Sequence, residues 1–403
     1  MTGLAVASFL AFGALLVLYG ANSSELIEAL GLSYADLGLL GSCLSLGLGV
    51  GIVIAGPLVD RWPRRPLYVA ACACVVAACL LLGPETDFRS LLIQTTLIGF
   101  GAGFYETVLN ALIIEEFGDT APRRLVFIHS AATLSAALTP LFFDALRSTT
   151  ELAWYDTFRL AGMAHIALVA AVAFVPMRAD ARRKHEPDAP IESPPWSVVP
   201  ATPDAKSLPL STSAASLGGE DRIAFAAICI ATFAYVGVES ALTLFVADHA
   251  RTSLGLDASR AAGTISAFWT GLLVGRLGVG LSPRTPGAGT TAALAAIAAV
   301  IVLAFGLGFI SPPELAMAGA GFFLGGVFPV MIGLAGQTLP RKAGLAVGLA
   351  GGLGSLGGFI VPWVTGELAG SGGLAGALAG LSGWICLLVA GTAFVRMRRT
   401  KSA

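Results

Sequence analysis

Charge is what this sequence lacks most. Only 12% of its 403 residues are charged, about half the share found in soluble domains, so an ordinary water-soluble fold is excluded. Lys and Arg are absent before Arg61, which argues against a cleaved signal peptide because such a peptide begins with a basic flank. Long segments of alternating apolar and polar residues are also missing, so we do not expect a transmembrane β-barrel.

Cysteine is scarce and is not arranged for chemistry. The six cysteines lie inside apolar runs without the spacing of metal ligands, which predicts small core residues. The sequence also lacks a nucleotide-binding glycine loop, a metal cluster and a nucleophile–base pair. We therefore expect no enzyme, no cofactor, no metal and no nucleic-acid partner.

Apolar runs fill the space that charge leaves. The sequence is 56% hydrophobic with a mean hydropathy of +0.81, and runs of roughly 17 to 25 residues, enough to cross a bilayer as a helix, recur throughout. The predicted fold is therefore all-α and integral to the membrane, with twelve transmembrane helices. The predicted spans are 4–24, 37–59, 66–83, 89–116, 124–145, 158–177, 222–247, 259–282, 288–310, 313–337, 342–367 and 373–395.

The twelve spans fall into two sets of six. Residues 1–178 form the first predicted bundle and residues 221–403 the second, and the Pro- and Ser-rich stretch 179–220 between them has the composition of a flexible linker. Gly101–Phe104 recurs as Gly319–Phe322 at corresponding positions of the two halves. This layout predicts two parallel six-helix pseudo-repeats, with a solute site between them at the bilayer midplane.

Basic residues gather in alternate loops and at the end of the chain, which by the positive-inside rule makes those loops, the linker and both termini cytoplasmic. We expect a multi-pass protein of the inner or plasma membrane. The loop residues that carry this prediction are Arg61, Arg64, Arg65, Arg123, Arg124, Arg284, Arg341 and Lys342.

A short motif closes the second span. Gly56 is followed by Asp60 and Arg61, and then by Arg64 and Arg65 directly before the third span. This stretch resembles the signature of the major facilitator superfamily, which implies a twelve-helix secondary transporter with these five residues as its cytoplasmic gate motif. Elementary chemistry agrees, because Gly56 permits close helix contact, Asp60 can pair with Arg61 or cap a facing helix, and the other arginines hold the loop in the cytoplasm.

Six further stretches resemble the fucose permease group of that superfamily, which implies a sugar:proton symporter. They occur in the expected order at residues 105–110, 124–140, 233–240, 268–276, 326–329 and 357–362.

Polar side chains interrupt the fourth predicted span. Gly99, Gly103, Glu106 and Asn110 recur at helical spacing and share one face. The glycines let a neighbouring helix approach, and a carboxylate at that depth indicates a functional site. We expect Glu106 and Asn110 to bind a polar solute and Glu106 to carry a proton; the alternative is a structural carboxylate bonded to a neighbouring helix.

Glu239, in the other half, can face Glu106 across a cavity, and we assign it to both solute and proton binding. The alternative is an ion pair of Glu239 with His249 or Arg251. His129 is the third candidate proton carrier, because histidine titrates near physiological pH; a packed, hydrogen-bonded histidine is the alternative.

Four more residues complete the predicted solute site. Tyr105, Tyr235 and Trp269 offer rings that stack on sugars, and Asn22 offers an amide. Trp269 faces either the cavity or lipid. Arg276 lies close to the end of its span, where we expect it to act in a gate or in helix packing.

These observations predict a secondary active transporter that moves a small polar solute, such as a sugar or related metabolite, by alternating access with proton coupling. We expect a monomer in the lipid bilayer whose partners are its small-molecule substrate and protons. A drug or metabolite exporter of the same fold is the alternative, and Ser23 favours it, because the fucose permease carries an aspartate at the comparable position. A transporter-shaped sensor or scaffold is the alternative from another class.

Overall fold

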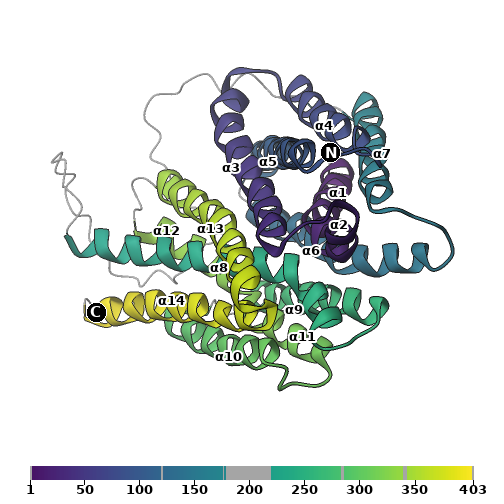
Figure 1. Ribbon diagram of the computed structural model, residues 1–403. Helices are drawn as coiled ribbons and strands as arrows, with labels where there is room; N and C mark the ends of the chain where they lie inside the picture. Colours follow the sequence, from purple (N-terminus) through teal and green to yellow (C-terminus); the bar gives the residue numbers. More distant parts are fainter. Residues whose placement is uncertain are drawn as a thin grey trace.

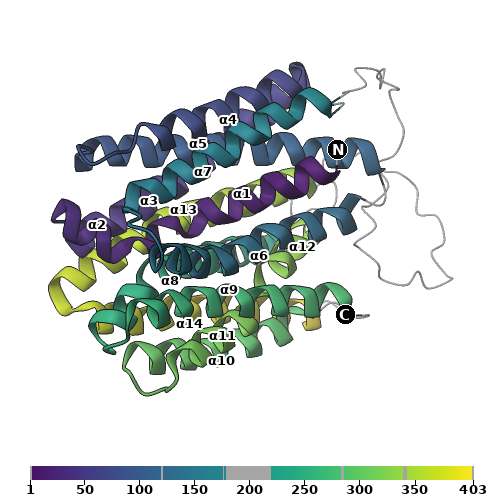
Figure 2. The same cartoon turned by 90° about the vertical axis from the view of Figure 1, so that its right-hand side faces the viewer.

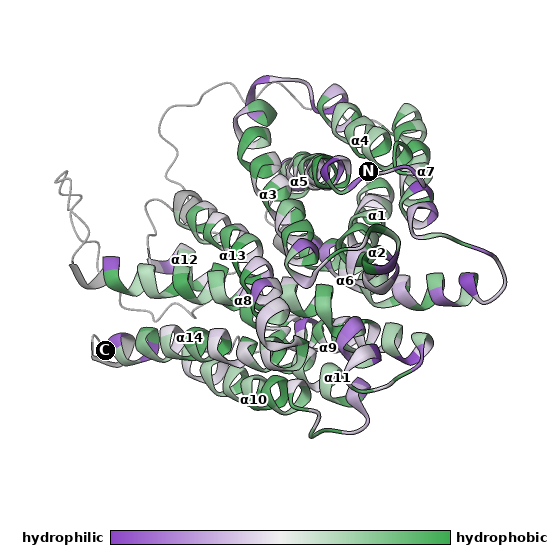
Figure 3. Cartoon of the chain, viewed as in Figure 1, coloured by the Kyte–Doolittle hydropathy of each residue, from purple (hydrophilic) through white to green (hydrophobic). Residues whose placement is uncertain are grey.

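The computed structural model describes residues 2–118, 121–175, 177, 219–282, 286–338 and 343–401. Within these ranges the chain is helical, without a strand, as the apolar runs predict. Figure 1 shows the helices gathered into two groups, α1 to α7 and α8 to α14, which lie side by side. Hydrophobic residues cover most of each helix, and polar residues collect near helix ends and in loops (Figure 3).

The first half contains the six predicted spans and one additional helix, α2, which continues beyond the first span. Its helices are α1 Thr2–Ala21, α2 Ser23–Leu30, α3 Tyr34–Arg61, α4 Arg64–Leu80, α5 Phe88–Phe117, α6 Ala121–Arg147 and α7 Trp154–Ala171.

The second half repeats this plan. Its helices are α8 Gly219–Thr252, α9 Ala258–Leu281, α10 Ala288–Gly306, α11 Pro313–Leu324, α12 Val327–Thr338, α13 Ala343–Gly372 and α14 Leu374–Lys401. Eleven helical segments of the described chain are long and apolar enough to cross a membrane, and α11 and α12 together make one of them. The 17-residue helix α4 corresponds to the remaining predicted span. The predicted linker lies outside the described residues except for its last two, which begin α8.

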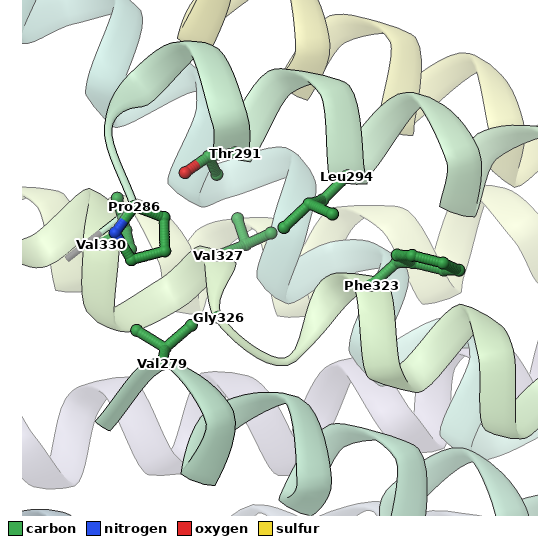
Figure 4. A pocket seen from close by; sticks show the side chains of 8 residues that line it. All are labelled: Val279, Pro286, Thr291, Leu294, Phe323, Gly326, Val327 and Val330. Carbon is green, nitrogen blue, oxygen red and sulfur yellow. The ribbon is translucent and has the colours of Figure 1, made fainter. Parts of the chain in front are cut away.

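Proline chemistry explains the break between α11 and α12. Pro329 has no N–H to donate to the carbonyl of Gly325, one helical turn earlier, and its ring crowds that carbonyl. The chain therefore turns at Gly325 and Gly326 before the helix resumes. A small hollow lies beside this break, with Val279, Phe323 and Val327 among its walls (Figure 4).

Glycines bring helices within each half into backbone contact. A Cβ added to Gly99 or Gly103 of α5 would lie 2.1 or 2.2 Å from a carbonyl oxygen of α3, as their spacing predicts. In the second half, a Cβ on Gly271 of α9 or Gly321 of α11 would lie 2.0 Å from a carbonyl oxygen of the other helix. The two halves are thus built on the same helix pairing.

Both chain ends lie at one end of the bundle, which we call the terminal face, and α2 lies at the opposite end, the far face (Figure 2). At the far face the halves touch through backbone: a Cβ on Gly20 would lie 1.9 Å from the Thr243 oxygen, and one on Gly38 would lie 2.6 Å from the Pro362 oxygen. Toward the terminal face, a Cβ on Gly56 of α3 would meet nothing within 4 Å. The halves therefore close on each other at the far face. The expected close helix contact at Gly56 is absent in this conformation.

Candidate functional site

Glu106 and Asn110 lie one turn apart on α5, and the side chains of both are partly exposed. Most of the other residues of this helix are apolar. Asn110 is within hydrogen-bonding reach of Glu106, and its Oδ1 accepts a hydrogen bond from His129 Nε2 on α6 at 3.2 Å. The ring of His129 packs against Phe9 of α1 with 4.5 Å between centroids. The two helices thus bring together a carboxylate, an amide and an imidazole in the first half.

A second polar group comes from the other half. Arg276 on α9 approaches Glu239 on α8 at 3.3 Å and donates from Nη2 to the Tyr235 hydroxyl at 3.1 Å. The side chains of Arg276 and Glu239 are 23% and 16% exposed, so the pair is largely removed from solvent. An ion pair in such surroundings stabilises little by itself, but either charge alone would be costly.

One hydrogen bond joins the two groups. Arg276 Nη1 donates to Thr133 Oγ1 at 3.0 Å, and Thr133 lies one turn after His129 on α6. Residues from both halves therefore form a continuous polar patch, which we call the central cluster: Glu106, Asn110, His129, Thr133, Tyr235, Glu239 and Arg276.

The central cluster has unused hydrogen-bonding capacity. Arg276 Nε is buried without a hydrogen-bond partner among the described residues. A buried donor without a partner is unusual in a native protein, and this N–H can donate a further hydrogen bond to water or to a ligand oxygen. The cluster offers carboxylate acceptors, guanidinium and imidazole donors and an amide, which together can replace the hydration shell of a polar solute.

Arg276 contacts two other helices, and its expected role in a gate or in helix packing stays a prediction. Its long side chain reaches Glu239 on the neighbouring helix. Glu239 accordingly pairs with Arg276, and the alternative pairing with His249 or Arg251 is absent from the described ion pairs. Thr133 was not expected at all, since a lone threonine in an apolar span carries no sequence signal.

Two predicted solute contacts lie elsewhere. Tyr105 is buried inside the first half, where its hydroxyl is 3.4 Å from His165 Nε2. Asn22 lies at the far face, where its amide donates to Thr157 Oγ1 at 3.0 Å and accepts from Arg147. Both side chains therefore lie outside the central cluster, with their polar atoms engaged by neighbouring helices of the same half, and their contact with a solute stays a prediction.

Trp269 is buried, which removes the expectation that it could face lipid. It lies two turns before Arg276 on the same face of α9, and its Nε1 has no hydrogen-bond partner among the described residues. Contact between the Trp269 ring and a solute remains a prediction.

The motif between the second and third spans lies at the terminal face, apart from the central cluster. Arg64 pairs with Glu115 near the end of α5, and Arg65 Nη2 donates to the Val172 carbonyl at 2.9 Å. Asp60 and Arg61 are exposed at the end of α3. The later arginines therefore bind the loop to its own half, and the acidic–basic pair is left accessible.

The hollow of Figure 4 does not resemble a polar solute site. Its lining is aliphatic and aromatic apart from the hydroxyl of Thr291, so it offers too few hydrogen-bonding groups to replace the water around a sugar.

A curated relative and several solved structures are similar to this chain. "Protein TsgA homolog" of Serratia proteamaculans (strain 568) is 20% identical over 278 residues, which cover 68% of this chain and 64% of the relative's length. The crystal structure of a D-xylose-proton symporter aligns over 98% of this chain and 96% of its own with a TM-score of 0.75 at 16% identity. That of the nucleoside transporter NupG aligns over 98% and 97% with a TM-score of 0.69 at 12% identity.

These structural likenesses show the fold, a helical arrangement shared with membrane transporters. The model of the family described as Major Facilitator Superfamily matches residues 4–362, which is most of the chain. The chain therefore belongs to the Major Facilitator Superfamily, a family of membrane-embedded transporters of small molecules and not of enzymes, as the loop motif and the internal repeat predict.

Proposed function

We propose that this transporter carries a small polar solute, with a sugar or related metabolite as the leading candidate, and that it couples this movement to protons. The observation that carries the proposal is the central cluster, in which Arg276 of one half bonds to Thr133 of the other at 3.0 Å. A polar group of this kind between two apolar helical halves matches a solute site reached alternately from each side. The similarity to a D-xylose-proton symporter supports the same solute class.

Glu106 and Asn110 serve the solute in this proposal, and Glu106 also takes a proton. The neighbouring His129 donates to Asn110 Oδ1, so Asn110 interacts with Glu106 through its amide nitrogen, which has two hydrogens and can also donate to a solute. At the corresponding positions of the second repeat the chain has Leu324 and Phe328. The pair is therefore not a requirement of the duplicated scaffold, which favours a role with the solute.

Glu239 and Arg276 form the other half of the proposed site. In the structure Glu239 neutralises Arg276 at 3.3 Å, so the site contains no uncompensated guanidinium. Protonation of Glu239 would free Arg276 to donate to solute oxygens, which provides a direct link between a proton and the solute.

The orientation in the membrane belongs to the proposal as well. Basic residues near the ends of the described helices at the terminal face, such as Arg61, Arg65 and Arg124, favour a cytoplasmic terminal face. The far face is then external, and the structure represents a conformation closed to the outside. We propose a monomer as the working unit.

The substrate class can be tested without assuming a direction of transport. A thermal-shift screen of the purified protein against sugars, organic acids and cationic drugs distinguishes a transporter of small polar solutes from a drug or metabolite exporter. Stabilisation by sugars supports the proposal, and stabilisation by cationic drugs alone favours an exporter.

Glu106 itself is tested by Glu106→Gln. The amide retains the size of the side chain but cannot carry the proton, so we expect solute uptake driven by a pH gradient in proteoliposomes to fall about 100-fold, the lower end of the effect of losing a general acid–base group. Glu116→Gln is the matched control, because Glu116 lies on the same helix and is exposed near its end at the terminal face. Unchanged gradient-driven uptake by Glu106→Gln would remove Glu106 from the coupling mechanism.

A further inference from the structure

A second buried carboxylate lies outside the central cluster, at the far face. Asp248 on α8 is 2% exposed. Its Oδ1 accepts from Ser24 Oγ of α2 at 2.9 Å, and its Oδ2 accepts from the Tyr34 hydroxyl of α3 at 2.8 Å. Both donors belong to the first half and the carboxylate to the second, so each of its oxygens bonds across the boundary between the halves.

These bonds lie in the region where the halves are pressed together. A Cβ on Gly366 of α13 would lie 2.4 Å from the backbone carbonyl oxygen of Tyr34. One on Gly20 of α1 would lie 1.9 Å from the backbone carbonyl oxygen of Thr243, five residues before Asp248. If the halves separate at the far face, both hydroxyls leave the carboxylate. Asp248 is therefore placed to report whether this face is open or closed.

Asp248 is free of a cation within ion-pair distance in the described part of the chain. The nearby Glu25 of α2 is engaged by Arg147 of α6 at 3.0 Å, and burial raises the pKa of the Glu25 carboxyl despite Arg147 and Arg251. The titratable and charged groups at this end of the elements packed against α8 are Tyr19 on α1, Glu25 and Glu28 on α2, Tyr34 and Asp36 on α3, Asp257 and Arg260 on α9 and Glu367 on α13, with His249 and Arg251 on α8 itself.

We propose that Asp248 is a proton-sensitive latch of the far face. As a carboxylate it accepts two charge-assisted hydrogen bonds, which are stronger than neutral ones. A proton taken from solvent turns one oxygen into a hydroxyl donor and removes the charge, so both bonds across the boundary weaken. Protonation then favours separation of the halves at this face.

The latch is distinct from the proton site proposed in the central cluster. Asp248 lies about 13 Å along α8 from Glu239, at the helical rise of about 1.5 Å per residue. The inference requires that the halves move relative to each other, but it requires neither a particular solute nor proton-coupled transport. It can therefore hold even if the assignments of Glu106 and Glu239 fail.

The test measures the separation of the far face directly. Spin labels are placed on Glu28→Cys of α2 and Ser371→Cys of α13, both exposed in the structure, in a chain whose six native cysteines are replaced. Electron–electron double resonance at about pH 7 and about pH 3, on either side of the ordinary aspartate pKa of about 3.9, gives the populations of short and long distances. We expect the long-distance population of the otherwise native chain to grow at the lower pH.

Asp248→Asn should raise the ratio of long to short distances at least about tenfold at the higher pH, the effect of weakening charge-assisted hydrogen bonds, and should abolish the response to pH. Tyr34→Phe removes one donor and leaves the carboxylate, so it should shift the ratio in the same direction while retaining a pH response. It also keeps the test informative if Asp248→Asn fails to fold. Asp36→Asn is the matched control, because the Asp36 carboxylate accepts from Ser33, the residue that caps its own helix α3, and not across the boundary between the halves.

Distances in Asp248→Asn equal to those of the control, or an undiminished pH response in that variant, would overturn the latch. If the variant does not fold, a Tyr34→Phe distribution identical to that of the control overturns it instead.

Discussion

Removing one member of the Glu239–Arg276 ion pair should cost more stability than removing both. Glu239→Gln leaves the Arg276 guanidinium, 23% exposed, without its counter-charge, and its partners among the described residues are then neutral: the glutamine oxygen and the Tyr235 and Thr133 hydroxyls. Breaking a buried pair in this way costs about 3–5 kcal/mol, and partial exposure to solvent reduces this to about 2–3 kcal/mol by screening. Arg276→Gln should cost a similar amount, because it leaves the Glu239 carboxylate without its cation.

The double variant Glu239→Gln/Arg276→Gln carries no uncompensated charge, and its amides can bond to each other. We expect its loss to be smaller than that of either single variant, which requires a coupling of at least about 2–3 kcal/mol, at the upper end of the range for residues in direct contact.

The assay is the apparent melting temperature of the purified protein, followed by intrinsic tryptophan fluorescence. At about 2–4 °C per kcal/mol for a unit of 150–250 residues, each single variant should melt roughly 4–12 °C below the wild-type protein. Strictly additive losses in the double variant would refute the ion pair as an energetic unit. Gradient-driven uptake should be lost in all three variants, because each removes a group of the central cluster.

Two further predictions concern the helix contacts and the tyrosines. Gly103→Val should destabilise the protein by about 1–3 kcal/mol through overpacking, since its Cβ would lie 2.2 Å from the Leu48 carbonyl oxygen. Gly56→Val should be tolerated, because a Cβ at Gly56 would have nothing within 4 Å. The melting temperatures of the two variants are compared. Tyr105→Phe should cost about 1 kcal/mol or less and leave uptake unchanged, whereas Tyr235→Phe removes a partner of Arg276 and should raise the KM of uptake. Equal KM values for the two tyrosine variants would contradict the placement of the solute.

Much of the architecture can be predicted from the sequence because each helix obeys local rules. The apolar length of a span is set by bilayer thickness, and the spacing of Gly99, Gly103, Glu106 and Asn110 places them on one side of α5 without knowledge of any neighbour. The backbone contact of both glycines with α3 confirms that side as a packing surface. The break at Gly325 follows from the single residue Pro329, but a proline can also kink a helix without breaking it.

The contacts between helices could not be predicted in the same way. Arg276 reaches Glu239 because α8 and α9 are neighbours and because the arginine side chain is long. From the sequence, the position of Arg276 near the end of its span indicated only that it lies toward the terminal face. Tyr105 directly precedes Glu106, yet consecutive residues on a helix point about 100° apart, so one enters the core of its half while the other joins the central cluster. The rotation of a helix about its axis decides such assignments, and apolar composition on every side of a membrane helix conceals it.

The distribution of contacts indicates where movement occurs. Within the halves, α3 with α5 and α9 with α11 are in backbone contact at glycines, so neither pair can separate without losing dense packing, and each half is expected to move as a unit. Between the halves, the described polar contacts include the two bonds of Asp248 at the far face and the bond from Arg276 to Thr133 at the central cluster. Hydrogen bonds of this kind can be exchanged for bonds to water at a modest net cost. Opening the far face therefore exchanges bonds at Asp248 while the interior of each half stays intact, and a solute bound at the central cluster can replace Thr133 as a partner of Arg276 without disturbing either half.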